Sequence, residues 1–111
     1  MPTNNFKSVG AAVLGSSGSI VYGPVAAGKE AVVHSVYVSN IDGTNSANID
    51  IKARNTSGST YFHVAKGIPV PAGSSLVLDK PIDLAATGDI HMTASTAGDL
   101  ETNLGILEIT L

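Results

Sequence analysis

Hydrophobic and polar residues alternate with a period of two along several segments of this chain. The clearest is residues 47–55 (ANIDIKARN), where every second residue is apolar and the residues between are polar. This period is typical of a β-strand with one buried and one solvated face. The pattern predicts a strand whose buried face holds Ala47, Ile49, Ile51 and Ala53.

Two further segments carry strand signals of the same kind. Residues 89–95 (DIHMTAS) alternate, which predicts Ile90, Met92 and Ala94 inside and Asp89, His91 and Thr93 outside. Residues 30–40 (EAVVHSVYVSN) are rich in β-branched and aromatic residues, which favour strands. Strict alternation there places four side chains on one face: Val32, His34, Val36 and Val38.

The remaining strands are shorter or flanked by turn residues. Residues 59–66 and 74–80 are expected strands, and residues 104–111 form a last strand that is apolar enough to lie centrally. Residues 8–14 and 19–23 are predicted to pair with each other. No window sustains a helical period. About eight short antiparallel strands predict an all-β fold, a single β-sandwich, and both jelly-roll and immunoglobulin-like topologies remain open.

Residues 39–50 (SNIDGTNSANID) gather side-chain oxygens around a glycine and raise the question of a calcium loop. An EF-hand loop has its glycine at position six and a glutamate at position twelve, between two helices. Counted from Asp42, the glycine comes second and position twelve is Ala53, and the flanks are predicted strands. Asp42 to Asn45 instead have the composition of a hairpin connection. The prediction is a polar turn without metal.

Other catalytic chemistry finds little support in the sequence. His34, His63 and His91 each stand alone in a predicted strand, without the His-x-His pair and following glutamate of a metal-binding cupin. Neither a Gly-x-Ser-x-Gly elbow nor a P-loop occurs. The chain is therefore expected not to be an enzyme, with no catalytic residue, metal or cofactor assigned.

The amino-acid composition indicates a surface that is partly covered by other molecules. Charged residues make up 14% of the chain, against about 25% in a typical domain, and mean hydropathy is +0.25. A surface of small neutral residues suggests that copies or partners cover much of it. The net charge of −3 argues against a nucleic-acid partner. No apolar run approaches membrane-spanning length, and the first residues do not resemble a signal peptide.

Three stretches together resemble small virion structural proteins of tailed phages, of the capsid decoration or cement kind. They carry a Pro-Ala-Gly turn before a strand, a step from Asp through Pro-Ile into the next strand, and an ending in Leu-Glu-Ile. The stretches are VPAGSSLVLDKPIDL (70–84), VSNIDGTNSANIDIKA (38–53) and TASTAGDLETNLGILEI (93–109).

The resemblance implies a β-sandwich that bridges major capsid subunits. Copies of the protein itself are the other expected partners, in an expected trimer on the capsid surface of the virion. Synthesis is expected in the host cytoplasm. Residues 1–7 are expected to form an N-terminal arm and residues 8–111 the sandwich. The expected partner-binding residues are Met1, Pro2, Thr3, Asn4, Asn5, Phe6, Asp42 and Asn45. An edge segment folded onto its own sheet is the alternative to the arm. Other roles left open are a neck, tail or baseplate module and a glycan-binding β-sandwich.

Overall fold

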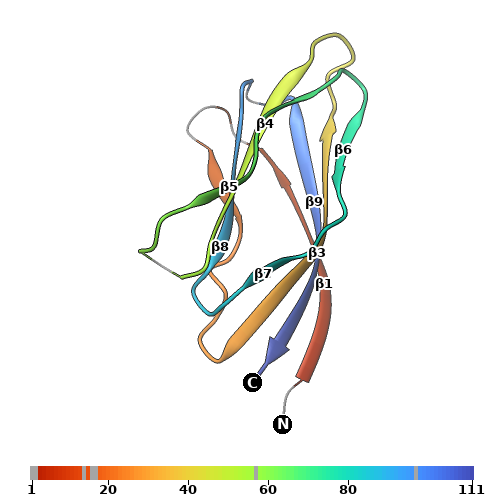
Figure 1. Cartoon of the computed structure of the whole chain (residues 1–111). Coiled ribbons are helices and arrows are strands. Elements are labelled where there is room, and N and C mark those ends of the chain that lie inside the picture. The colour runs from red at the N-terminus through yellow and green to blue at the C-terminus, as the bar shows by residue number, and fades with distance from the viewer. Residues whose placement is uncertain (1–2, 14, 16–17, 57, 97) are drawn as a thin grey trace.

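The computed structural model describes residues 3–13, 15, 18–56, 58–96 and 98–111, and in them the protein consists of β-strands joined by turns (Figure 1). No helix long and apolar enough to cross a membrane occurs in these ranges. The nine strands are β1 (Thr3–Ala12), β2 (Ser19–Tyr22), β3 (Lys29–Asn40), β4 (Ala47–Arg54), β5 (Phe62–Val70), β6 (Ser75–Leu78), β7 (Ile82–Leu84), β8 (Asp89–Ala94) and β9 (Leu100–Thr110).

The strands form two antiparallel sheets with a jelly-roll topology. Sheet A has the order β1-β9-β3-β6, with β7 also paired to β3, and sheet B has the order β2-β8-β4-β5. The pairs β1–β9, β2–β8, β3–β6 with β7, and β4–β5 are those of one long hairpin whose tip is the β4–β5 connection. Rolling this hairpin pairs β9 with β3 and β8 with β4, which gives the jelly roll of the two expected topologies.

The core lies between the two sheets and follows the alternation of the sequence. Ile49 and Ile51 of β4 and Ile90 and Met92 of β8 are fully buried, as their phase predicts. From sheet A they meet Val33, Val36, Val38, Leu104 and Ile106, all fully buried. The prediction that the last strand lies centrally is confirmed, since β9 pairs with β1 on one side and β3 on the other.

Two sequence-based predictions about the first sheet are wrong. Residues 8–14 and 19–23 do not pair with each other, because β1 pairs with β9 in sheet A and β2 pairs with β8 in sheet B. Val32 and His34 do not share a face with Val36 and Val38. The ladder between β3 and β9 shifts between Val33 and Ser35, and such a bulge reverses the side-chain phase of the strand.

The loops at one end of the sandwich are joined by backbone hydrogen bonds. The Ile41 amide donates to the Asp99 carbonyl at 2.8 Å, and the Gly73 amide donates to the Asp42 carbonyl at 3.1 Å. The connections β3–β4, β5–β6 and β8–β9 therefore meet at this end. The C-terminus and the start of β1 lie at the other end, as Figure 1 shows.

Candidate functional site

The N-terminal residues expected to bind a partner belong in part to an edge strand. Met1 and Pro2 lie outside the described residues. Thr3 to Phe6 form the first part of β1, which pairs with β9 in an unbroken register from Thr3 opposite Thr110 to Ala12 opposite Glu101. The strand runs through residue 7, the expected boundary between arm and sandwich. Its side chains are exposed from Thr3 to Ser8, and Phe6 is 73% exposed.

The loop with the other two expected residues is built around a buried asparagine. Asn40 is 3% exposed, and its Nδ2 donates to the Asn45 and Val70 carbonyls at 2.9 Å each. Its Oδ1 accepts the Asp42 amide at 2.9 Å. Asn40 thus ties the loop to β5. The alternation of β3 carried a signal for this role, because Asn40 continues the inward phase of Val36 and Val38.

Within the loop, Asp42 caps the backbone that follows it. Its Oδ1 accepts the Thr44 amide at 2.8 Å and the Asn45 amide at 3.4 Å, and these bonds lower the pKa of the Asp42 carboxyl. The polar-turn prediction is confirmed in this respect. The expected hairpin is wrong, since β3 lies in sheet A and β4 in sheet B, so the loop carries the chain from one sheet to the other.

A second polar cluster, missed at the sequence level, covers the outer face of sheet B. Asp89 is fully buried, although its phase predicted an outward position. Arg54 donates to its Oδ2 from Nε at 3.1 Å and from a terminal nitrogen at 2.9 Å, and the Tyr61 hydroxyl donates to its Oδ1 at 2.6 Å. The two side chains lie over the carboxylate and remove it from water. The ion pair raises the pKa of Arg54, and burial together with Asp89 raises that of Tyr61.

The three histidines occupy separate settings. His91 packs against the Tyr61 ring at 5.5 Å between centroids, and burial lowers its pKa. His63 and His91 both lie opposite Lys52 in the ladders of sheet B, so the lysine separates them. His34 lies in sheet A beside the Phe6 ring. Among the described residues, no three His, Asp or Glu side chains gather closely enough to hold a metal ion.

Glu108 forms a third cluster, where β1 meets β9. Its Oε2 accepts the Tyr22 hydroxyl at 2.6 Å and lies 3.4 Å from Lys7 Nζ, and its Oε1 lies 4.0 Å from Lys29 Nζ. The hydrogen bond from Tyr22 is the main cause that lowers the pKa of Glu108. The cluster joins β1, β3 and β9 of sheet A to β2 of sheet B. Its role is structural, because the carboxylate is held by groups of its own chain.

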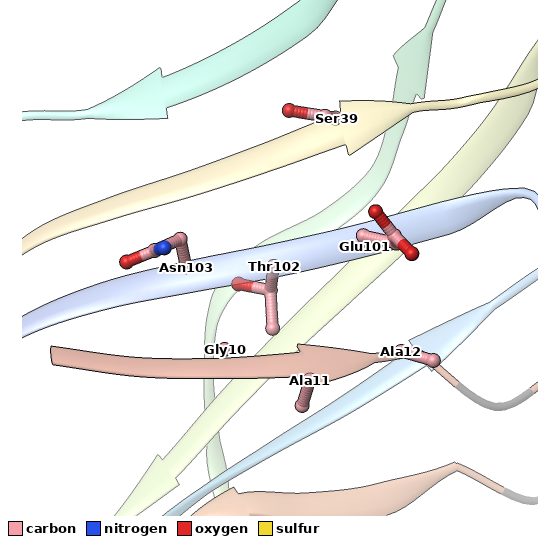
Figure 2. A pocket seen from close by; sticks show the side chains of 7 residues that line it. All are labelled: Gly10, Ala11, Ala12, Ser39, Glu101, Thr102 and Asn103. Atoms are coloured by element: carbon pink, nitrogen blue, oxygen red, sulfur yellow. The ribbon is translucent and has the colours of Figure 1, made fainter.

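A groove of about 470 Å³ crosses β1, β9 and β3 near the end where the loops meet. Figure 2 shows small residues from β1 on one side and polar side chains from β9 beside them. Glu101 is the titratable side chain among the described residues that line it, and no histidine, lysine or arginine accompanies it there. The described residues of the groove form a surface on which a partner could bind, and they include no nucleophile paired with a base. The lining consists of Gly10, Ala11, Ala12, Ser39, Glu101, Thr102 and Asn103.

Comparisons with known proteins show the fold. No protein-family model matches the sequence, and no curated protein matches it significantly. A chain from the structure of infectious bursal disease virus, Gx strain, superposes with a TM-score of 0.57 at 10% identity, over 100% of this chain and 32% of that one. The D431N mutant VP2 of the same virus, in T=1 particles, gives 0.56 at 10% identity, over 96% and 31%.

A chain from the acid-stable capsid structure of Helicobacter pylori bacteriophage KHP30 matches over nearly its whole length. It gives a TM-score of 0.50 at 12% identity and covers 98% of this chain and 93% of that one. By contrast, this chain spans about a third of the infectious bursal disease virus chains that it matches. At such identities the likeness is one of fold.

Proposed function

We propose that the protein is a non-enzymatic structural component of a phage virion that decorates the capsid and bridges major capsid subunits. The observation that carries the proposal is the jelly roll itself. It is shared, over 98% of this chain, with a chain of similar length in a bacteriophage capsid structure. The sequence stretches that resemble decoration proteins of tailed phages support the same role.

The surface chemistry agrees with a protein that meets neighbours on a lattice. The side chains of Tyr37 and Val77 lie opposite each other on sheet A and are 46% and 50% exposed. Phe6, from the same sheet, is exposed as well. Each contact would be modest, and many copies on a fixed lattice would supply the avidity. The polar clusters of Asp42, Asp89 and Glu108 are engaged by their own chain, which favours structural over catalytic roles.

The proposed contacts divide between the two ends of the sandwich. The loop with Asp42 and Asn45 is proposed to face the capsid protein, since residues 43–46 are exposed at that end of the sandwich. The N-terminal segment Met1–Phe6 is proposed to contact a neighbouring subunit of the major capsid protein. The trimer implied by the resemblance stays a prediction for the protein on the capsid, whereas the contact proposed below concerns the purified protein in solution.

Copy number in purified virions tests the role. Quantitative mass spectrometry against the major capsid protein is expected to give a ratio that approaches one per capsid subunit, as lattice symmetry requires. A few to some tens of copies would instead assign the protein to a neck, tail or baseplate. Absence from the particle would refute the structural role.

A further inference from the structure

The sandwich has four open sheet edges, and three of them carry features that hinder strand pairing. The edge strand β2 is four residues long and shifts register between Ile20 and Tyr22. Strand β5 contains Pro69 and shifts register twice against β4. Strands β6 and β7 are four and three residues long, and residues 79–81, an Asp-Lys-Pro step, separate them. Short strands, bulges, charges and proline are the usual means of protecting an edge.

The fourth edge, β1, is long and unprotected. It has ten residues in unbroken register with β9, and its sequence (TNNFKSVGAA) contains no proline. Its one charged side chain, Lys7, is 3.4 Å from Glu108 Oε2 and so is paired within its own chain. A long, regular edge of this kind is a template for another strand.

The register also shows which backbone groups face outward. The Val13 amide donates to the Leu100 carbonyl at 2.9 Å and continues the β1–β9 ladder. Because antiparallel residues alternate between bonding to one neighbour and to the other, the odd-numbered residues of β1 bond to β9. The amide and carbonyl groups of the even-numbered residues therefore point to the open edge. These residues are Asn4, Phe6, Ser8, Gly10 and Ala12.

We propose that β1 pairs with β1 of a second copy of this chain, antiparallel about a two-fold axis, so that the two A sheets form one continuous sheet. The strand is compatible with itself, since its one charge is neutralised internally and its other side chains are neutral. A two-fold contact of this type is closed by two copies. The inference does not depend on the proposed virion role.

Phe6 and Gly10 select the register of this contact. The outward backbone groups of one copy must lie opposite those of the other, so the two-fold axis must pass through a residue of β1 and not between two residues. A centre at Lys7 would place two lysines directly opposite, which is unfavourable. A centre at Ser8 retains residues 4–12, allows about ten backbone hydrogen bonds, and sets each Phe6 opposite Gly10 of the second copy. A Cβ added at Gly10 would have its nearest neighbour at 3.9 Å, so open space above the glycine can receive the exposed ring.

Measurement of mass in solution tests the contact. The purified protein is expected to form dimers by sedimentation or light scattering, in a concentration-dependent way. Phe6→Ala and Gly10→Thr should each raise the dimer dissociation constant about tenfold or more, because both copies lose the contact. Phe6 is 73% exposed and Gly10 borders open space in the monomer, so both variants should retain the fold. Phe62→Ala, on β5 of sheet B and 73% exposed like Phe6, is the matched control and should leave the constant unchanged.

Cross-linking tests the register directly, because the chain contains no cysteine. The proposed pairing sets Asn4 opposite Ala12 of the second copy, at about 5.5 Å between Cα atoms, within the range of a disulfide. A mixture of the Asn4→Cys and Ala12→Cys proteins should give a mixed disulfide dimer on mild oxidation, while either protein mixed with Ser75→Cys should not. A monomeric mass at all accessible concentrations, a mass of three copies, or cross-links that ignore the register would each overturn the proposal.

Discussion

Asn40 is the residue whose replacement should most directly loosen the loop that carries Asp42 and Asn45. Its amide makes three hydrogen bonds of 2.9 Å, to the Asn45 and Val70 carbonyls and from the Asp42 amide. Asn40→Ala removes all three partners at once. The bond to the Val70 carbonyl is buried, so water cannot replace it after the substitution.

The expected cost follows from the setting of each bond. Each of the three bonds contributes about 0.5–1.5 kcal/mol. Asn40→Ala should therefore lower the free energy of unfolding by roughly 1.5–4.5 kcal/mol. Asn40→Asp should cost still more at neutral pH. It keeps the acceptor for the Asp42 amide but sets a carboxylate oxygen against two carbonyl oxygens.

Urea denaturation of the wild type, Asn40→Ala and Asn40→Asp, followed by circular dichroism, measures these differences in stability. Asn103→Ala is the matched control, because Asn103 is exposed on β9 and its loss should change the stability by no more than about 0.5 kcal/mol. A loss of stability below about 1 kcal/mol for Asn40→Ala would refute the energies assigned to the three hydrogen bonds. An Asn40→Asp protein as stable as Asn40→Ala would refute the geometry.

Two further predictions concern sheet A. The hydrogen bond from Tyr22 lowers the pKa of Glu108 below its ordinary 4.5, so the ionised Glu108 contributes fully to the folding stability above pH 4.5 and loses this contribution as the pH falls through the lower pKa of the folded state. The difference in folding stability between the wild type and Glu108→Gln should therefore shrink from pH 7 to pH 3. A difference that stays constant would contradict this. Gly105→Ala should destabilise modestly, because its Cβ would come within 2.5 Å of His34 Cε1 and 2.7 Å of Ser35 Oγ, so both side chains would have to move. Gly10→Ala should leave the monomer's melting temperature nearly unchanged, and equal melting temperatures for the two variants would contradict this.

The sequence predicted the faces of β4 and β8 well, because the ladder that joins these two strands is regular. Ile49, Ile51, Ile90 and Met92 are fully buried as expected, because β4 and β8 lie inside sheet B and bury one face against the core. Alternation records burial, so it is reliable where burial is one-sided. It carries less information at a bulge. The shift after Val33 exchanged the faces of half of β3, and no residue type announces that shift.

Asp89 shows a different limit of the same reasoning. Its phase is shared with His91 and Thr93 and is outward, so a charged residue there was expected to meet water. The structure covers it with Arg54 and Tyr61, which come from segments far away in the sequence. A pattern within one strand cannot report a side chain that arrives from another. For the same reason β1 was paired with its neighbour β2, when the rolled hairpin brings it to β9.

The expected arm, residues 1–7, includes the first part of β1, whose sequence from Thr3 to Ser8 shows no alternation of apolar and polar residues. Alternation arises when one face of a strand is buried, and β1 has all its side chains from Thr3 to Ser8 exposed. The missing period therefore reflected an edge strand lying beyond the core, which leaves its composition free of the demand for inward apolar residues. Strand β1 itself contains no proline, no bulge and no unpaired charge that would keep another strand away. An exposed strand that keeps its outer backbone groups accessible can therefore accept a second strand, as the proposed contact requires.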